Sequence, residues 1–376
     1  MSRAAGILEK AEGPAFPRGF LHEGDDPAAR VYIRPLDGNG RATCRPQRCE
    51  VLIRRIEGTV AIAAPTEEVL AWAAAEGFGL ARHVEATLDA IAAERPTFAG
   101  LGVDKPLVMG IINVTPDSFS DGGEFLDAER AIAHGRRLVA EGADILDVGG
   151  ESTRPGAAAV SPETETARVL PVVRALAAEG FAVSIDTRRA AVMKAALEAG
   201  ARIVNDITAL EGDPRAPGVV ADAAAPVVLM HMQGEPGTMQ NDPRYVDAAL
   251  DVFDYLRDRI AACEAAGIPR RRIAVDPGIG FGKTVAHNLR ILGCLELFLG
   301  LGCVILLGVS RKSFIGRLSH GEPPAERLAG SLAAALAGAA RGAHILRVHD
   351  VAETRQALAV WQAIADAEAG RPDGPP

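Results

Sequence analysis

Polar and ionisable residues follow the short apolar runs of this sequence at the points where those runs end. They are Asn113, Asp147, Asp186, Asn205, His231, Asp276, Lys312, Arg347 and His349. Each alone has an ordinary explanation, because an Asp after a strand often caps the next helix, and for His231 we favour a structural role. A protein gains no stability by gathering so many unpaired polar groups at one end of its fold. The whole set therefore indicates a ligand site.

Asp186, Asp276 and Asn205, with Asp147 as a further candidate, suit a ligand that presents an array of N–H donors. An ionised carboxylate accepts two parallel N–H bonds, and such charge-assisted pairs are strong. A guanidine-like ring edge is the natural partner. This half of the set predicts a purine-like or pterin-like heterocycle.

Lys312, Arg347 and His349 have the opposite character and predict an anion site. The last two units of a (β/α)₈ barrel commonly hold phosphate, aided by the N-terminus of a short helix, which here would start near Ser313. Asn113 offers an oxygen ligand for Mg²⁺, which bridges phosphates with few protein ligands. The expected ligand thus joins a heterocycle to a phosphorylated group.

Other kinds of site lack the residues they need. The segment 276–283, DPGIGFGK, is rich in glycine but does not have the spacing of a Walker phosphate loop. No Ser–His or Cys–His pair stands out as an activated nucleophile. Cys44 and Cys49 have no second pair with which to form a zinc ribbon, and the other three cysteines fit small core residues. No disulfide framework is expected.

The elements that must position these residues follow from an alternation of apolar runs and helical stretches. Eight runs are expected as strands, at 107–112, 144–147, 182–185, 202–204, 226–230, 272–275, 303–307 and 344–346. The intervening helices are expected at 127–141, 162–179, 188–199, 215–223, 244–266, 285–297, 324–341 and 350–367. Eight such units favour a (β/α)₈ TIM barrel, which places its chemistry at the C-terminal ends of the strands. A doubly wound sheet is the alternative, but no dinucleotide-type glycine turn follows the first strand.

The first 100 residues have a different pattern and form a small α/β extension of unknown role. VYIRPL, CEVLIRR and TVAIAA are typical of short strands, and 66–94 predicts one or two helices. No set of chemical groups converges there, so we expect this part to cover the barrel or to mediate assembly. The barrel is expected over 105–368, and residues 369–376 are expected to form a disordered tail.

The composition fits a globular chain of 376 residues, with 48% hydrophobic and 24% charged residues. The net charge of −9 argues against a broad nucleic-acid surface. The longest uncharged apolar stretch, 297–309, is too short to span a membrane. The N-terminus has no secretory signal pattern, so a soluble, cytoplasmic protein is expected.

Eight motifs together resemble the dihydropteroate synthase family of folate biosynthesis. They occur in the family's order and span nearly all of 105–368: MGIINVTPDSFSDGG (109–123), DVGGESTRPGA (147–157), SIDT (184–187), VNDI (204–207), MHMQGEPGTMQ (230–240), DPGIGFGK (276–283), GVSRKS (308–313) and RVHD (347–350). Any one motif is weak, but eight in register are specific. The resemblance does not account for the first 100 residues.

The resemblance implies condensation of 6-hydroxymethyl-7,8-dihydropterin diphosphate with 4-aminobenzoate, giving 7,8-dihydropteroate and diphosphate. By motif, the pterin would contact Asp186, Asn205, Met230, Asp276, Phe281 and Lys312. Arg347 and His349 would hold the diphosphate, with Asn113 acting through Mg²⁺ as the cofactor. Thr153, Arg154 and Ser313 would help to form the aminobenzoate site, and the loop 114–123 would close over the substrates. A homodimer is also implied.

Two other functions compete with this one. A pterin-binding methyltransferase on the same barrel would keep the pterin carboxylates but has no use for a diphosphate clamp. A non-catalytic paralogue would be expected to have lost one of Asn113, Arg154, Lys312, Arg347 or His349, and all are present. The sequence therefore favours the transferase.

Overall fold

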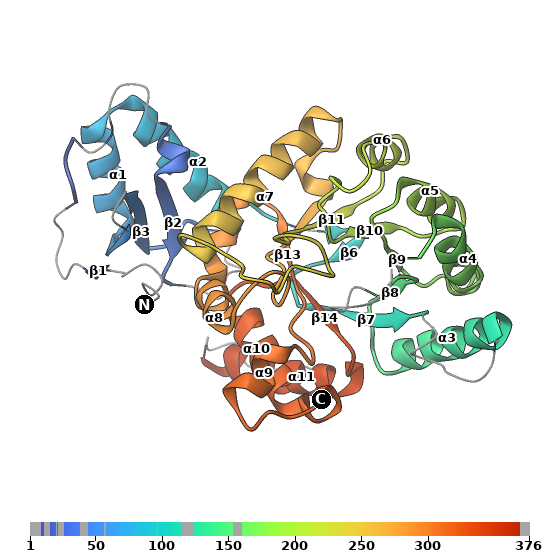
Figure 1. The fold of residues 1–376 in the computed structure, drawn as a ribbon. Helices are drawn as coiled ribbons and strands as arrows, with labels where there is room; N and C mark the ends of the chain where they lie inside the picture. Colours follow the sequence, from blue (N-terminus) through green and yellow to red (C-terminus); the bar gives the residue numbers. More distant parts are fainter. Residues whose placement is uncertain are drawn as a thin grey trace.

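A closed barrel of eight parallel strands forms the larger part of the molecule (Figure 1). The computed structural model describes residues 9–10, 16–19, 21, 26–37, 44–55, 58–95, 97–114, 123–152 and 160–368. The barrel strands are β7 (Leu107–Asn113), β8 (Ile145–Gly149), β9 (Val183–Asp186), β10 (Ile203–Asp206), β11 (Val227–Met230), β12 (Ile273–Asp276), β13 (Val304–Leu307) and β14 (Ile345–Val348). β14 pairs with β7 and closes the barrel. The predicted TIM barrel is confirmed, and each strand overlaps its predicted run.

Helices surround the barrel in the expected alternation. They are α3 (Gly123–Ala140), α4 (Pro162–Ala178), α5 (Ala190–Glu198), α6 (Ala216–Asp222), α7 (Ala248–Ala265), α8 (Val285–Gly293), α9 (Ser313–Leu318), α10 (Leu328–Ala340) and α11 (Val351–Glu368). Among the described residues, no helix combines the length and the apolar character needed to cross a bilayer.

Most predicted helices differ from the observed ones by a few residues at their ends, and in three of them the difference has a clear structural cause. The predicted helix 285–297 ends at Gly293, and a 3₁₀ helix, η4 (Leu295–Leu301), follows it after Cys294 leaves helical geometry. The predicted helix 324–341 is a 3₁₀ turn, η5 (Pro324–Glu326), and then α10, because the turn closes at Arg327 before the α-helix begins. Helix α7 begins only at Ala248, since Asp247 caps it by accepting a bond from the Ala249 amide.

Apolar side chains fill the barrel interior and its N-terminal end. The strand residues are buried on both faces, as is usual for a parallel sheet covered by helices. A short hairpin of β5 (Thr97–Phe98) and β6 (Leu101–Gly102) packs at this end. Its Phe98 is buried in one cluster with Met109, Ile145 and Leu306 from three barrel strands. The barrel is thus a packed core, and its opposite end is available for a site.

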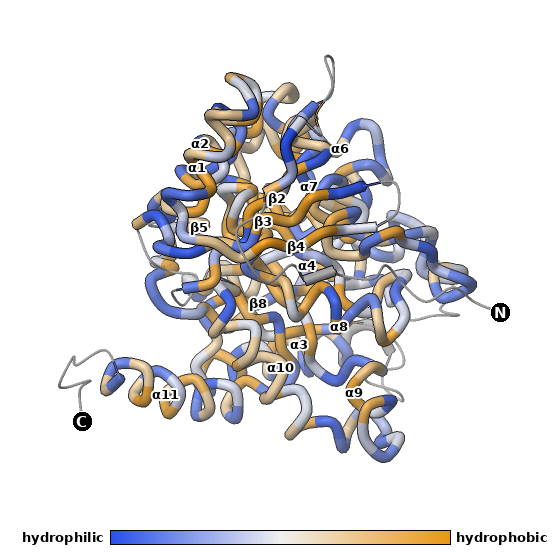
Figure 2. The backbone as a smooth tube through the Cα atoms, turned by 90° about the vertical axis from the view of Figure 1, so that its left-hand side faces the viewer, coloured by the Kyte–Doolittle hydropathy of each residue, from blue (hydrophilic) through white to orange (hydrophobic). Residues whose placement is uncertain are grey.

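The N-terminal part forms a separate small sheet beside the barrel. Its strand order is β1-β4-β3-β2, made by β1 (Glu9–Lys10), β2 (Val31–Pro35), β3 (Arg48–Arg55) and β4 (Gly58–Pro65). Figure 2 shows hydrophobic residues concentrated along β2, β3 and β4. Helices α1 (Thr66–Glu76) and α2 (Phe78–Ala92) pack on this sheet, and β2 and α2 also contact η4 of the barrel. The unit therefore lies against the flank of the barrel next to α7 and α8 (Figure 1).

Candidate active site

A cavity at the C-terminal ends of the barrel strands brings together most of the predicted site residues. Its lining comprises Ile111, Asp186, Asn205, Ile207, Met230, Asp276, Phe281, Gly308, Ser310, Lys312, Arg347 and His349. These residues come from seven of the barrel strands or the loops that follow them, which is where a barrel of this kind carries its chemistry.

Arg347 joins the acidic residues of this cavity. Its Nε donates to Asp147 Oδ2 at 2.6 Å, and its Nη2 donates to Asp186 Oδ2 at 2.8 Å. The same Asp147 oxygen accepts a bond from Asn205 Nδ2 at 2.9 Å. The amide nitrogen of Asn205 is thus engaged, and its Oδ1 is the acceptor that remains for a ligand N–H. Asp147, whose role the sequence left open, lies fully buried beneath the cavity.

The cavity itself is small in this arrangement, about 60 Å³. Ligand pockets usually measure about 300–1,000 Å³. The Arg347 guanidinium is a planar array of N–H donors, and it already lies on Asp147 and Asp186. A ligand with a guanidine-like edge would therefore share Asp186 with Arg347, or would displace Arg347 in order to bind both carboxylate oxygens.

The loop after β12 shapes the other side of the cavity. Asp276 is 6% exposed, and its Oδ1 accepts a bond from the Gly278 amide at 2.7 Å. Burial raises the pKa of the Asp276 carboxyl, although this hydrogen bond and Lys312 oppose the change. Lys312 Nζ lies over the Phe281 ring, 4.0 Å from its centroid. Burial lowers the pKa of Lys312 to about 8, with Asp276 opposing the change.

The imidazole of His349 is held in one orientation by Ser310. Ser310 Oγ accepts a bond from the His349 backbone amide at 3.2 Å and lies 2.9 Å from His349 Nδ1. The hydroxyl proton is then available to Nδ1, which leaves the ring proton on Nε2. Burial, together with the charge of Arg347, lowers the pKa of His349 to about 3, so the ring is neutral at physiological pH. Ser310 was not among the predicted site residues, although it stands within the GVSRKS motif.

A second cavity adjoins this one and carries a basic lining. It measures about 480 Å³ and is bounded by Asn113 and His349 together with Arg130, His134 and Arg137 from α3. Asn113 and His349 thus face a common space. Among the described residues, no group of three or more His, Cys, Asp or Glu could hold a metal ion.

The remaining predicted residues have different positions. Ser313 is exposed at the first position of α9 and does not line the cavity. Thr153 and Arg154 lie outside the described residues, as do 115–122 of the loop that was expected to close over the substrates.

Arg189 is a second residue near the site that was not predicted. It joins the two described ends of the loop that carries Thr153 and Arg154, because its Nη2 donates to Glu151 Oε1 at 2.9 Å and to the Val160 carbonyl at 2.5 Å. Its position next to SIDT, in a sequence otherwise typical of a helix start, gave no signal of this contact.

His231 is packed behind the cavity. Its Nδ1 lies 2.9 Å from Lys283 Nζ, which also donates to the carbonyls of His231 and Phe281. Burial lowers the pKa of Lys283 well below its usual value. Gly278 has a φ of +67°, and a Cβ on it would lie 1.9 Å from the His231 carbonyl oxygen. The loops after β11 and β12 therefore interlock behind the site.

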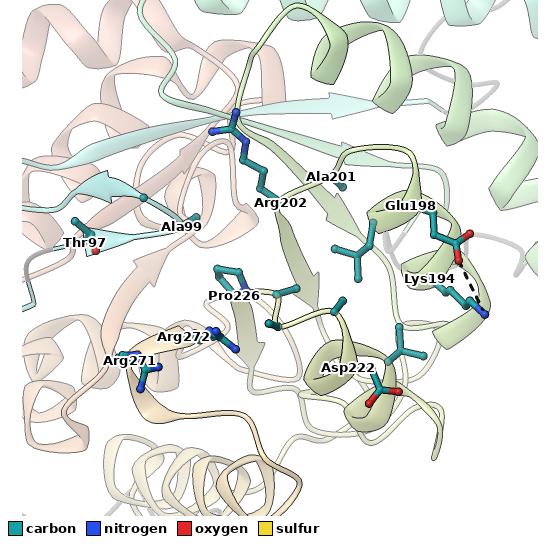
Figure 3. A pocket seen from close by; sticks show the side chains of 16 residues that line it. Thr97, Ala99, Lys194, Glu198, Ala201, Arg202, Asp222, Pro226, Arg271 and Arg272 are labelled. Carbon is teal, nitrogen blue, oxygen red and sulfur yellow. Dashed lines mark ion pairs between the residues drawn. The ribbon is translucent and has the colours of Figure 1, made fainter.

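A larger cavity, about 830 Å³, lies at the opposite end of the barrel (Figure 3). Arg202, Pro226 and Arg272 line it, and each directly precedes a barrel strand. Figure 3 shows the guanidinium groups of Arg202 and Arg271 pointing away from each other. These cations do not converge on one ligand, so the site at the C-terminal ends remains the candidate active site.

Comparisons with known proteins agree on one family. The family model for pterin binding enzymes matches residues 109–349. The dihydropteroate synthase of Neisseria meningitidis is 51% identical over 269 residues, which cover 70% of this chain and 94% of that protein. The dihydropteroate synthase of Escherichia coli is 48% identical over 270 residues, which cover 71% of this chain and 95% of that protein.

Solved structures give the same result. The Xanthomonas albilineans dihydropteroate synthase with 4-aminobenzoic acid superposes with a TM-score of 0.67 at 52% identity, covering 70% of this chain and 95% of that one. The same enzyme in complex with 7,8-dihydropteroate superposes with a TM-score of 0.65 at 50% identity and the same coverage.

Proposed function

The chain belongs to the family of pterin-binding enzymes as a dihydropteroate synthase, and from that premise we propose which of its residues carry the reaction. The enzyme condenses 6-hydroxymethyl-7,8-dihydropterin diphosphate with 4-aminobenzoate, giving 7,8-dihydropteroate and diphosphate. The single observation that carries the residue assignment is the convergence of carboxylates and cations in one cavity at the strand ends.

We propose that Asp186, Asn205 and Asp276 accept the N–H donors of the pterin. The two carboxylates lie on the same cavity as the Asn205 side chain, whose nitrogen is already bound to Asp147. Lys312 would donate to a ring acceptor, and Met230 and Phe281 would enclose the ring between apolar surfaces. Removal of water from this slot strengthens each charge-assisted bond.

Arg347 and His349 would hold the diphosphate. When the pterin takes Asp186, the guanidinium of Arg347 is released to meet the anion that arrives with the same substrate. His349 would donate through Nε2, since Ser310 occupies its other nitrogen. Both groups stabilise the charge that develops on the leaving diphosphate.

The cofactor that we propose is Mg²⁺, held by Asn113. A single protein oxygen at the edge of a basic cavity fits this ion, which takes most of its ligands from water and from phosphate oxygens. When bound, Mg²⁺ would neutralise charge on the diphosphate. Among the described residues, the lining of that cavity includes no Asp or Glu that would compete with the anion.

The chemical step needs positioning more than a base. The arylamine is already neutral near pH 7, so no side chain has to remove a proton before attack. Departure of diphosphate leaves positive charge on the electron-rich dihydropterin, and the carboxylates that hold the ring would stabilise it. For the aminobenzoate site we propose Thr153, Arg154 and Ser313, with Arg189 fixing the ends of the loop that carries the first two.

The assignment is tested by turnover of the purified chain with dihydropterin diphosphate, 4-aminobenzoate and Mg²⁺, followed by chromatography of dihydropteroate. Product is expected only when all three are present, and Lys312→Ala and Arg347→Ala are each expected to lower kcat/KM for the pterin substrate by about a hundredfold. A rate near that of the unmodified protein in either variant would remove that residue from the site. Tight pterin binding without product would favour a non-catalytic paralogue.

Assembly and location extend the proposal. Ala329, Ala333 and Ala337 form an exposed small-residue face on α10, which supports a homodimer that light scattering would test. All five cysteines are free thiols, which fits the reducing cytoplasm as the place of action. The substrates are small molecules, and neither nucleic acid nor a membrane has a place in the reaction.

We also propose that 105–368 is the catalytic domain and that the N-terminal unit is an accessory part. The matched relatives are spanned almost completely by about 70% of this chain. Residues 369–376, expected to form a disordered tail, lie outside the described residues.

A further inference from the structure

We propose that Arg54 of the N-terminal unit is a positioning residue for the pterin slot. Arg54 would hold Asp251 of α7 in place. Asp251 would in turn hold the end of the loop between β11 and α7, residues 231–247, and this loop contacts the loop after β12. The inference rests on the proposed pterin site and gives the N-terminal unit a part in substrate binding.

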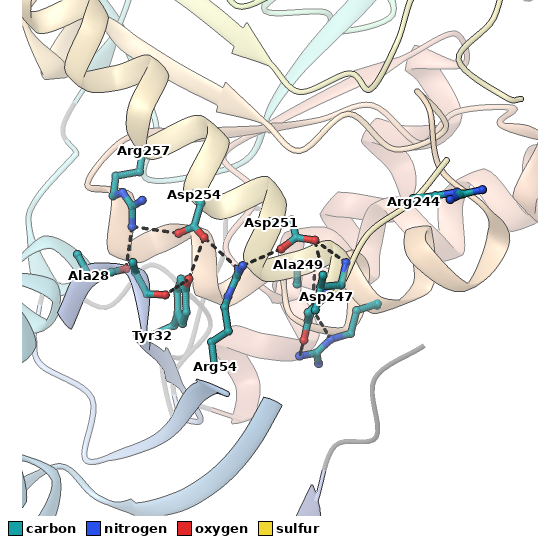
Figure 4. Close-up of polar contacts among 12 residues, drawn as sticks. Ala28, Tyr32, Arg54, Arg244, Asp247, Ala249, Asp251, Asp254 and Arg257 are labelled. Atoms are coloured by element: carbon teal, nitrogen blue, oxygen red, sulfur yellow. Dashed lines mark hydrogen bonds and ion pairs between the residues drawn. The ribbon is translucent and has the colours of Figure 1, made fainter. Parts of the chain in front are cut away.

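Arg54 forms the central polar contact between the two parts of the molecule (Figure 4). It stands near the end of β3, and its Nη1 lies 3.0 Å from Asp251 Oδ1, while its Nη2 lies 3.0 Å from Asp254 Oδ2. Tyr32 of β2 donates its hydroxyl proton to the same Asp254 oxygen at 2.8 Å. The Arg54, Asp251 and Asp254 side chains are only 21–26% exposed, so solvent screens the ion pairs less than on an open surface.

Asp251 connects this contact to the loop. While its Oδ1 faces Arg54, its Oδ2 accepts bonds from the backbone amides of Val246 at 2.8 Å and Asp247 at 3.3 Å. These two residues end the loop 231–247, directly before α7. Arg54 also lies between two carboxylates one helical turn apart, which would otherwise repel each other. Its charge therefore favours the orientation in which Asp251 holds the loop end.

The loop 231–247 in turn binds the loop after β12, which forms one side of the proposed pterin site. Tyr245 donates its hydroxyl proton to the Gly282 carbonyl at 2.8 Å, and Gln240 Nε2 donates to the Gly280 carbonyl at 2.6 Å. Phe281, the ring beneath Lys312, lies between these two anchored glycines. A Cβ on Gly282 would come within 2.4 Å of the Gln233 carbonyl oxygen, so the two loops are in backbone contact. A shift at the loop end would thus displace Phe281.

Arg34 provides a matched control for Arg54. It lies on β2 of the same sheet, its side chain is 19% exposed, and its Nη1 donates to the Gly293 carbonyl of the barrel at 2.9 Å. That carbonyl is at the far end of α8, and the polar partners of Arg34 in the described structure, Glu50 and Gly293, include neither Asp251 nor the loop 231–247. Removing Arg34 therefore weakens the attachment of the N-terminal unit without changing Asp251.

The test compares Arg54→Ala and Arg34→Ala in the full chain by calorimetric titration with dihydropterin diphosphate and by steady-state kinetics. We expect Arg54→Ala to raise the Kd for this substrate by about tenfold, as for mutations that act through intervening contacts. The KM for 4-aminobenzoate in Arg54→Ala, and the pterin Kd in Arg34→Ala, should stay within about twofold of the unmodified protein. Arg54→Lys, which retains the charge, should recover part of the pterin affinity.

A double-mutant cycle examines the path. If Arg54 acts through the loop, its effect on the pterin Kd should be smaller in a Tyr245→Phe background than in the unmodified protein. Equal pterin affinity in Arg54→Ala and Arg34→Ala, or full additivity with Tyr245→Phe, would overturn the inference. If Arg54→Ala does not fold, the same comparisons apply to Arg54→Lys. If the unmodified chain itself bound no pterin, the proposed function would fail instead.

Discussion

Arg347 is the residue whose position says most about the site. Its guanidinium lies on Asp147 and Asp186, and one of these, Asp186, was predicted to take a guanidine-like ring edge. A charged side chain of the protein thus keeps these carboxylates paired where we propose that the pterin binds. These ion pairs reduce the free-energy cost of burying the two carboxylates while no substrate is bound.

Asp276 provides the first test at the residue scale. Asp276→Asn keeps the shape of the side chain but removes the charge that strengthens its bonds to the pterin. Pterin binding should weaken by about 1.5–3 kcal/mol, the value of a hydrogen bond to a charged group. Calorimetric titration measures this, with Asp258→Asn on the exposed face of α7, where the side chain is 70% exposed, as a control. Unchanged affinity would exclude Asp276 from the pterin contacts.

The lowered pKa of Lys312 leads to a prediction of how activity depends on pH. Its pKa is lowered to about 8, so the ammonium is present below that pH and lost above it. If the cation binds the pterin, kcat/KM for dihydropterin diphosphate should fall as the pH rises through about 8. Folding stability should change in the opposite direction, because an unfolded lysine binds its proton more tightly and deprotonation above pH 8 relieves the cost of burying the charge.

The measurement is a pH profile of kcat/KM from pH 6.5 to 9.5. Lys312→Arg, which carries a charge that does not titrate in this range, should lose the alkaline decline if the variant remains active. A profile of the unmodified enzyme that stays level between pH 7 and 9 would mean that Lys312 does not bind the pterin as a cation.

The elements that carry the site were predictable because their pattern is local. Apolar runs that end in a polar residue located the barrel strands, and the strand ends located Asp186, Asn205 and Asp276. Ser310 and Arg189 were missed because their roles depend on partners far along the chain, His349 in one case and the two ends of a loop in the other. A residue that positions another has no signature in a single sequence.

The predicted end of the helix 285–297 was wrong because the observed end depends on tertiary packing. The stretch 285–297 has helical composition throughout, but the chain leaves the α-helix at Cys294 and packs Leu297 and Phe298 into the core as a 3₁₀ helix. Tertiary packing there overrides local propensity.

Gly278 tests the interlocked loops at the element scale. Its φ of +67° disfavours any side chain, and a methyl group would meet the His231 carbonyl. Gly278→Ala should lower the free energy of unfolding by about 3 kcal/mol or more, as backbone strain and steric conflict add, and should weaken pterin binding.

Gly218→Ala is the control. Gly218 lies in α6 with no neighbour within 4 Å, and alanine should stabilise that helix by about 0.5–1 kcal/mol. Chemical denaturation of the two variants gives the comparison, and equal stabilities would contradict the interlock.

At the scale of the whole molecule, the N-terminal unit is the part that could be predicted least from the sequence. Its strands and helices could be identified, but its place on the barrel could not, since that depends on pairs such as Arg54 with Asp251, about 200 residues apart. Beside its apolar packing, two kinds of polar contact attach it. Ion pairs reach α7, whereas Arg95, in the segment that joins the two parts, binds only carbonyl groups.

The hydrogen bonds of Arg95 lead to a prediction about how the molecule unfolds. Its guanidinium donates to the carbonyls of Ala90 at 2.7 Å and Leu299 at 2.8 Å, and its Nε donates to that of Cys303 at 3.0 Å. One side chain thereby ties the end of α2 to η4 and to the start of β13.

Arg95→Ala would remove these partly buried hydrogen bonds, and in the described structure only the Leu299 carbonyl is known to keep another partner, the Gly302 amide. The expected cost is about 3 kcal/mol. Because the lost bonds cross between the two parts, scanning calorimetry should show the N-terminal unit melting before the barrel, in place of a single transition. Arg45→Ala is the control, since Arg45 pairs with Asp89 on the open surface of the N-terminal unit and such pairs contribute little. A single transition in Arg95→Ala, at the temperature of Arg45→Ala, would mean that the unit is attached mainly by its apolar contacts and the ion pairs to α7.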